Sequence, residues 1–333
     1  MDSRRHRWST SAVVRIGTAL TIVAIAAVFY RQATTTTIIG DTLRAIQQIG
    51  LPTILAVLAL SLVNYVMRFV RWTMYIGEPA ERLSPIRHLA IYLAGFALTA
   101  TPSKSGEAVR SVYLKPMGIS YERSLAALVA ERLTDFVVIS AMAMLILFQH
   151  ASAVRWLGLL GLGLAFTLLA LQHPTILGLV ERLVQRVPVP LVRKAAGHAL
   201  SLLHAVRAHM RPGMLLPALA LATVAWVAEG IGLYLILQRL GVDLGVVPSI
   251  GIYATAVVAG AVTFLPGGLG STELVMITLL TSVGAAGSTA IAATACIRLA
   301  TLWFAVAIGA GAWLAIESIY GATNFLWGRG RSQ

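Results

Sequence analysis

The sequence predicts an all-α integral membrane protein with about six full transmembrane helices plus two re-entrant helical hairpins, arranged as an inverted repeat. Three observations support this prediction. Of the 333 residues, 58% are hydrophobic and only 12% are charged, whereas about 25% of the residues in an ordinary soluble domain are charged. Several apolar stretches reach about 20 residues, the length at which a helix crosses a bilayer. Two shorter apolar segments run into a proline at related places in the two halves of the chain.

The six apolar stretches that are long enough to cross lie at residues 13–30, 51–72, 122–148, 154–172, 214–237 and 286–316. The first follows several arginines and resembles a signal peptide. We expect a retained anchor instead, because no small-residue cleavage site follows Tyr30. The two shorter segments, 86–101 and 249–265, each end at a proline.

These two shorter segments belong to an internal repeat. Each contains Ile-Tyr, at 91–92 and 252–253, and then passes through Pro, Gly and Glu in that order. From Glu107 it is 11 residues to Gly118 and 25 to Arg132, and from Glu273 it is 11 to Gly284 and 25 to Arg298. Chance produces one such coincidence easily, but several in register indicate a true repeat.

The positions of Lys and Arg favour re-entrant hairpins at 86–118 and 249–284 over complete crossings. With hairpins, the basic segment 174–212 and both chain ends are cytoplasmic, as the positive-inside rule requires. The basic loop residues then left outside are Arg31, Arg44, Arg155 and Arg239. The hairpins enter from opposite faces, so the two halves are inverted, as in many secondary transporters. The formal charge of +13 is explained by orientation and anionic lipid, and nucleic acid is not expected as a partner.

The chain is thereby divided into five parts: an anchor helix with an external loop (1–50), a first repeat (51–148), a linker (149–213), a second repeat (214–317) and a cytoplasmic tail (318–333). The linker contains a further crossing and then residues 174–212, where apolar positions follow helical spacing on both sides of Pro188 and Pro190. This pattern predicts two amphipathic helices on the membrane surface. A solvated linker is the alternative.

Ionisable residues in or beside apolar segments are the candidate functional residues, because charge inside a membrane is costly and usually functional. The candidate substrate-binding residues are Lys104, Glu107, Arg110, Arg132, Asp135, Glu229, Glu273 and Arg298, and the candidate hairpin breaks are Pro102, Gly106, Pro266, Gly267, Gly268 and Gly270. The structural alternative is mutual neutralisation. Arg132 can pair with Asp135 three residues later, and Arg298 with Glu229 or Glu273.

Glu107 and Glu273 follow Gly-containing breaks and fit helix starts, where a carboxylate complements free backbone amides. Such a start also binds anions, so phosphate-bearing lipid headgroups are the natural ligand. Arg68 and Arg71, at the end of the second stretch, are expected to extend to lipid headgroups and not to form part of a site.

Other chemistries find little support. The sequence has no P-loop, no His-Glu-x-x-His zinc motif and no Gly-x-Ser-x-Gly elbow. Cys296 is the one cysteine, so a disulfide framework is excluded. We therefore expect no cofactor and no metal.

The stretch from Pro102 to Arg110, the sequence Ala-Glu131-Arg132-Leu-Thr-Asp135, and Pro266 to Glu273 followed by Arg298-Leu together resemble the lysylphosphatidylglycerol synthase transmembrane-region, or flippase-like, family. The resemblance covers roughly residues 50–317. One departure is Ser103-Lys104-Ser105, where the family pattern has Gly-Arg-hydrophobic. The best-known members also carry a soluble aminoacyl-transferase domain, for which this sequence has no room, so the synthase activity does not follow from the resemblance.

The resemblance implies a flippase-like transporter of the bacterial inner membrane, with both termini cytoplasmic, that moves a phospholipid or other lipid-linked headgroup between leaflets. Its expected partners are that lipid and anionic phospholipid at the cytoplasmic surface. Two alternatives remain. One is a membrane-embedded transferase acting on a polyprenyl- or lipid-linked sugar, with Glu107, Asp135 or Glu273 as general base. The other is a non-catalytic partner of a separately encoded lipid-modifying enzyme.

Overall fold

The computed structural model describes residues 36–101, 105–147, 163, 173–186 and 188–320, and this part of the chain contains helices and no strand. Three apolar helical segments within it are long enough to cross a membrane: Leu43–Ile76, Pro212–Arg239 and Gly287–Ser318. They contain the segments 51–72, 214–237 and 286–316, which are thereby confirmed as apolar helices of membrane-spanning length. The predicted crossings at 13–30 and 154–172 lie outside the described residues.

Helix α6 (Tyr121–Leu147) occupies the predicted crossing at 122–148. It is 27 residues long but is not among the apolar segments, because Glu131, Arg132 and Asp135 interrupt it near its middle. Helix α2 (Thr36–Ile76) begins earlier than expected and bends at Gly50, whose φ of 72° is not helical. Residues 36–49, which we expected in an external loop, are therefore helical.

Both proline-interrupted regions fold as two helical arms separated by a break. In the first region, α4 (Pro85–Ala94) and η1 (Gly95–Leu98) form one arm, and η2 (Ser105–Ala108), α5 (Val109–Leu114) and η3 (Lys115–Met117) form the other. In the second, α11 (Val246–Val262) packs against α12 (Ser271–Ser282). The glycines of the second break, Gly267, Gly268 and Gly270, all have positive φ, a conformation that other residues adopt only at a cost. Whether these hairpins are re-entrant in a membrane stays a prediction.

Corresponding elements begin at corresponding places in the two halves. The number of residues from the start of η2 to the start of α12 equals the number from Glu107 to Glu273. It also equals the number from the start of α6 to the start of α13 (Gly287–Arg298). Gly118 and Gly284, which end the second arms, have φ values of 86° and 94°. The spacing repeat found in the sequence is therefore a repeat of structure.

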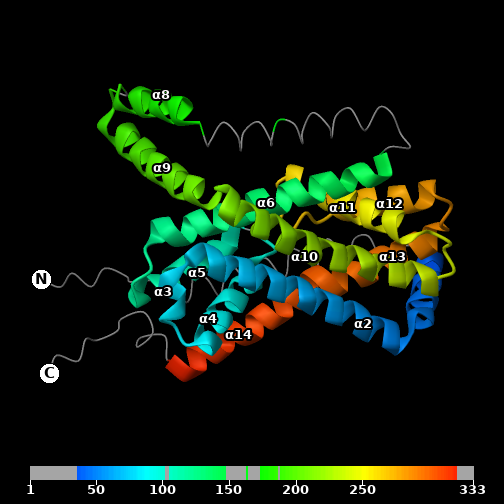
Figure 1. Cartoon of the computed structure of the whole chain (residues 1–333). Helices are drawn as coiled ribbons and strands as arrows, with labels where there is room; N and C mark the ends of the chain where they lie inside the picture. The colour runs from blue at the N-terminus through cyan, green and yellow to red at the C-terminus, as the bar shows by residue number, and fades with distance from the viewer. Residues whose placement is uncertain (1–35, 102–104, 148–162, 164–172, 187, 321–333) are drawn as a thin grey trace, which may run out of the picture.

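Reciprocal contacts relate the halves by an approximate two-fold axis. Sequence segments 63–68 and 224–229 correspond, so Tyr65 and Trp226 occupy equivalent positions in the two halves. Asp135 and Thr301 are likewise equivalent positions of the repeat. The Trp226 Nε1–H donates to Asp135 Oδ1 at 2.9 Å, and the Tyr65 hydroxyl donates to the carbonyl of Thr301 at 2.7 Å. Helices α2 and α10 (Pro212–Arg239) pack together and run in opposite directions (Figure 1). The arrangement is that of an inverted repeat.

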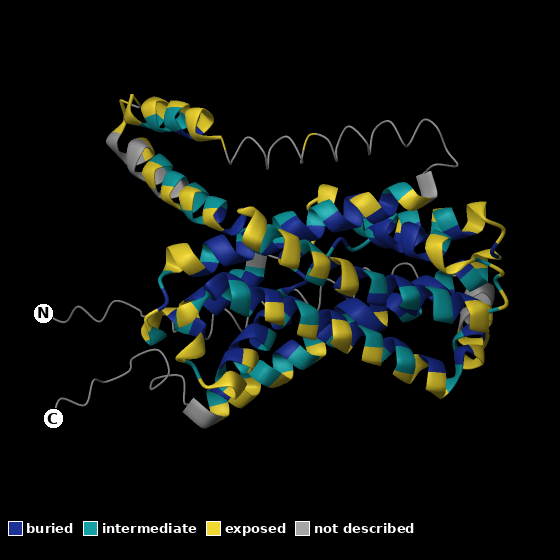
Figure 2. Ribbon diagram, in the orientation of Figure 1, coloured by how far each residue is buried: buried dark blue, intermediate teal, exposed yellow. Residues whose placement is uncertain are grey.

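The segment before α10 forms two further helices, α8 (Pro174–Gln185) and α9 (Pro190–His209). Figure 2 shows α8 and the start of α9 extending away from the bundle with many exposed residues. The end of α9 packs on α6 and buries Val206 and Met210. The two predicted helices are thus confirmed, while their position on a membrane surface stays a prediction.

Helix α14 (Phe304–Tyr320) follows a π-helical turn, η4 (Leu299–Trp303), and packs closely on the first hairpin. Gly309 makes this packing possible, because a Cβ at this position would lie 2.2 Å from the backbone nitrogen of Ala97. Gly311, on the same helix, has no atom within 4 Å of such a Cβ.

This difference predicts opposite effects for two similar substitutions. Gly309→Ala should lower the unfolding free energy by about 1–3 kcal/mol, because a backbone contact cannot give way without moving η1. Gly311→Ala should be neutral or slightly stabilising, since alanine favours helix over glycine. Thermal unfolding of the detergent-solubilised variants measures both. Equal unfolding temperatures would contradict the packing described.

Candidate functional site

A buried network of four arginines and three carboxylates connects the elements of the first half. Arg68 and Arg71 come from α2, Arg110 from α5 and Arg132 from α6; the carboxylates are Glu107 from η2, and Glu131 and Asp135 from α6. Except for Arg132, whose side chain is 25% exposed, each of these side chains is at most 5% exposed. Charges buried this deeply are tolerated only when each finds opposite charge and hydrogen bonds.

Glu131 lies at the centre of this network. Its Oε1 is 3.0 Å from Arg68 Nη2 and 3.1 Å from Arg132 Nη2, and it also accepts a hydrogen bond from the Tyr92 hydroxyl at 3.2 Å. Asp135 Oδ1 lies 2.6 Å from Arg71 Nη2. Glu107 Oε2 lies 3.0 Å from Arg110 Nη2 and 3.3 Å from Arg132 Nη2. The network therefore ties α2 and the first hairpin to α6.

Aromatic rings cover the guanidinium groups of Arg68 and Arg110 in this network. The Arg110 guanidinium carbon lies 4.0 Å from the ring centre of Tyr92 and 5.3 Å from that of Trp72, while that of Arg68 lies 5.2 Å from Phe96. Cation–π contacts of this kind are strongest where water is excluded. They hold the cations in place without neutralising them.

The prediction for Arg68 and Arg71 was wrong. Their residues are only 4% and 0% exposed, and they point into the protein to pair with Glu131 and Asp135. The reason is that carboxylates on the neighbouring elements already pair with both arginines inside the protein, so neither arginine needs a lipid headgroup as its partner.

The second half contains a smaller ion pair at the corresponding place. Arg298 Nε donates to Glu273 Oε1 at 2.6 Å, and Arg298 Nη2 donates to the carbonyl of Gly267 at 2.7 Å. The other oxygen of Glu273 accepts the backbone N–H of Gly270 at 2.7 Å. Glu273 thus starts α12 as expected and also pairs with Arg298, as one of the two expected pairings of this arginine required.

The equal intervals between Glu and Arg are now explained. Each interval of 25 residues joins the two members of one ion pair, Glu107 with Arg132 and Glu273 with Arg298. In each half, the pair fastens the second hairpin arm to the long helix that follows it. The expected i, i+3 pairing of Arg132 with Asp135 is also present, at 3.7 Å.

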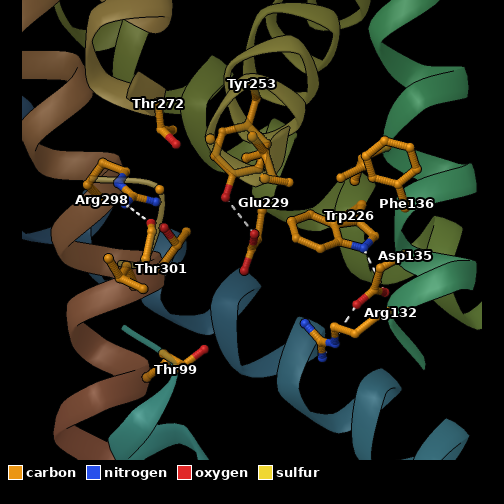
Figure 3. Close-up of a pocket in the computed structure, with 18 of the residues that line it drawn as sticks. Thr99, Arg132, Asp135, Phe136, Trp226, Glu229, Tyr253, Thr272, Arg298 and Thr301 are labelled. Carbon is orange, nitrogen blue, oxygen red and sulfur yellow. Dashed lines mark hydrogen bonds and ion pairs between the residues drawn. The ribbon is translucent and has the colours of Figure 1, made fainter. Parts of the chain in front are cut away.

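A cavity of about 260 Å³ lies between the halves. The first half contributes Arg68, Thr99, Arg132 and Asp135 to its wall, and the second half contributes Glu229, Gly267, Gly268 and Arg298. Figure 3 shows Glu229 between Arg298 on one side and Arg132 with Asp135 on the other. A Cβ built on Gly267 would lie 3.3 Å from the Cα of Ala100, so the two hairpin breaks meet beside the cavity.

The candidate residues divide into those that line the cavity, those behind its wall, those at the hairpin breaks and those outside the described residues. Arg132, Asp135, Glu229, Arg298, Gly267 and Gly268 line the cavity. Behind the cavity wall lie Glu107, Arg110 and Glu273. Glu107 and Glu273 pair with the cavity residues Arg132 and Arg298, and Arg110 pairs with Glu107. At or beside the breaks lie Gly106, Pro266 and Gly270. Lys104 and Pro102 lie outside the described residues.

Sequence reasoning missed Arg68, Trp226 and Tyr253 as cavity residues. A signal for the first two was present, since Val-Asn-Tyr-Val-Met-Arg68 aligns with Val-Ala-Trp-Val-Ala-Glu229. Tyr253 belongs to the repeated Ile-Tyr, and its hydroxyl donates to Glu229 Oε2 at 2.6 Å. In the described part of the chain, no group of three or more His, Cys, Asp or Glu residues is placed to hold a metal ion.

The network makes a clear stability prediction. Glu131→Ala should destabilise the protein by about 3–5 kcal/mol, because it leaves several buried guanidinium groups without their shared carboxylate. Glu122→Ala, on an exposed position of the same helix, should change stability little. Thermal or denaturant unfolding of both variants is the measurement, and a mild loss for Glu131→Ala would show that the network does not hold the half together.

Comparison with known proteins agrees with this architecture. The chain is 28% identical to a UPF0104 membrane protein of Methanothermobacter thermautotrophicus, over 68% of this chain and 74% of that protein. It is 20% identical to a UPF0104 membrane protein of Pyrococcus horikoshii, over 81% and 89% of the two chains. The model of the family described as the lysylphosphatidylglycerol synthase transmembrane region matches residues 13–309. The chain is a multi-pass membrane protein that belongs to this family.

Proposed function

We propose that this protein is a flippase-like transporter that moves a phospholipid or another lipid-linked headgroup between the two leaflets of a membrane. The observation that carries the proposal is the cavity beside the hairpin breaks, to whose wall both halves of the apolar bundle contribute charged side chains. Irregular backbone at membrane depth is tolerated where it lines such a cavity. Inverted repeats commonly place their substrate site at this junction.

The chemistry of the wall suits a phosphate-bearing headgroup. Arg68, Arg132 and Arg298 all line the cavity, and arginine is well suited to phosphate because its planar fork can donate two hydrogen bonds. The acyl chains would stay in the surrounding lipid while the headgroup passes through the cavity. The proposed setting is a bacterial inner membrane, with both termini in the cytoplasm.

The transferase alternative finds less support in the geometry. A general base must reach the hydroxyl from which it takes a proton. Glu107 is fully buried and, like Glu273, does not line the cavity. Asp135 lines it, but its Oδ1 already accepts hydrogen bonds from Arg71 and Trp226. A role beside a separately encoded lipid-modifying enzyme is compatible with transport, and α8 and α9 would be the docking face.

Transport can be measured in vesicles with a tail-labelled fluorescent phospholipid and a membrane-impermeant quencher. Wild-type protein should speed exchange between leaflets. Arg298→Gln and Glu273→Gln should slow it about ten- to a hundredfold, because each breaks a charged contact of about 1.5–3 kcal/mol at the cavity.

Arg123→Gln is the matched control, since Arg123 is exposed on α6 away from the network. It should transport at the wild-type rate. Folding of each variant is checked by thermal unfolding before reconstitution. Wild-type rates in folded Arg298→Gln and Glu273→Gln proteins, or no transport by the wild type, would sink the proposal.

A further inference from the structure

The cavity reaches the protein surface at the second hairpin break. Among the described residues that line it, Ala261 and Leu265 are exposed, and the remainder are buried or half-buried. Ala261 is the penultimate residue of α11, and Leu265 lies in the break that follows. A side chain that lines a cavity and is also exposed outside marks an opening. The cavity therefore has a mouth at this hairpin.

The corresponding place in the first hairpin is closed. Ala100 is the repeat equivalent of Ala261, because each lies nine residues after the Ile of the repeated Ile-Tyr. Ala100 and its neighbour Thr99 are buried, and Ala100 lies against Gly267 of the second break. By contrast, every residue from 261 to 266 is exposed. An inverted repeat offers two equivalent openings, and among the described residues the one in the second half is open.

The rim of the mouth is apolar and firmly built. Val262, Phe264 and Leu265 are each at least 43% exposed. Phe264 has a φ of 53°, which a bulky residue adopts only at an energetic cost and mostly at functional sites. The two arms behind it are held together, because Thr263 Oγ1 and Ser271 Oγ share a hydrogen bond at 2.8 Å. Phe264 is thus kept projecting from the break.

Arg132 supplies the accessible positive charge on the cavity wall. Its side chain is 25% exposed, whereas those of Arg68 and Arg298 are at most 7% exposed. Figure 3 shows Arg132 and Phe136 on the same side of the cavity, and both come from α6, which packs against α11. The cavity therefore joins an apolar rim to a guanidinium group that a ligand can reach.

A phospholipid has the chemistry that fits both features. Its phosphate can accept two hydrogen bonds from a guanidinium group, and its acyl chains can cover the apolar rim. A soluble anion would leave the rim uncovered, and a lipid without a phosphate would gain nothing from Arg132. At membrane depth, irregular backbone is tolerated where it borders a wet cavity, as this break borders the mouth.

We propose that residues 261–266 form a lateral mouth of the cavity and hold a phospholipid there, with its phosphate against Arg132 and its acyl chains against Phe264 and Leu265. This inference rests on the proposed function, because it names the place where the lipid joins the cavity. It makes Arg132 the residue that binds the phosphate at this opening.

Photo-crosslinking in vesicles tests the mouth directly. The full-length protein, with benzoylphenylalanine in place of Leu265, is reconstituted in diglucosyl diacylglycerol that contains a minor share of phosphatidylglycerol with the same acyl chains. Mass spectrometry gives the ratio of phospholipid to glycolipid adducts on the protein. This ratio should exceed that of the vesicle about tenfold, as expected for one added charged contact. A ratio equal to that of the vesicle would overturn the proposal.

The same probe in place of Leu314, an exposed residue of α14, reports ordinary lipid contact and should give the ratio of the vesicle. Arg132→Gln should lower the ratio at position 265 to that at 314, while Arg132→Lys, which keeps the charge, should retain most of the enrichment. Enrichment that Arg132→Gln leaves unchanged would contradict the assigned phosphate contact. Enrichment without lipid transport would contradict the proposed function alone, and transport without enrichment would contradict the mouth alone.

Discussion

The first half depends on one constraint, which is the buried pairing of arginines from α2, α5 and α6 with the carboxylates Glu107, Glu131 and Asp135. Charge in an apolar interior costs several kcal/mol per group unless it is paired, so these helices can assemble in few ways. Separating the hairpin from α6 would break the pairs of Glu107 with Arg132 and of Arg110 with Glu131. The aromatic rings over Arg110 exclude the water that would otherwise screen the pairs. This rigid half forms one wall of the cavity.

The second half repeats the plan with fewer charges. It keeps the pair that fastens the second arm to the following helix, Glu273 with Arg298, while the counterparts of Glu131 and Asp135 are Ile297 and Thr301. Arg298 also binds the carbonyl of Gly267 in the break, so this pair holds the tip as well as the arm. The cavity therefore lies between a heavily cross-linked wall and one held by a single strong pair, with the hairpin breaks meeting at its edge.

Much of this could be predicted from the sequence because the features are local. Crossings follow from apolar length, the breaks follow from Pro266 and the adjacent glycines, and the spacing of Glu107 with Arg132 identified pairs that are in contact. The burial of Arg68 and its pairing with Glu131 could not be predicted in this way. A cation at a helix end is satisfied equally well by lipid or by Glu131, and only the packing of α2 against α6 decides between them. The same holds for Trp226, whose partner Asp135 is 91 residues away.

The central claim is that headgroups pass between the two hairpin breaks, and a reversible crosslink tests it most directly. A Cβ on Gly267 would lie 3.6 Å from the Cβ of Ala100, within the range of about 3.5–4.5 Å that a disulfide spans. Ala100→Cys with Gly267→Cys, in a Cys296→Ala background, should transport lipid when reduced, stop when oxidised and recover on reduction. Equal transport by the fully oxidised and reduced protein would contradict passage between the breaks.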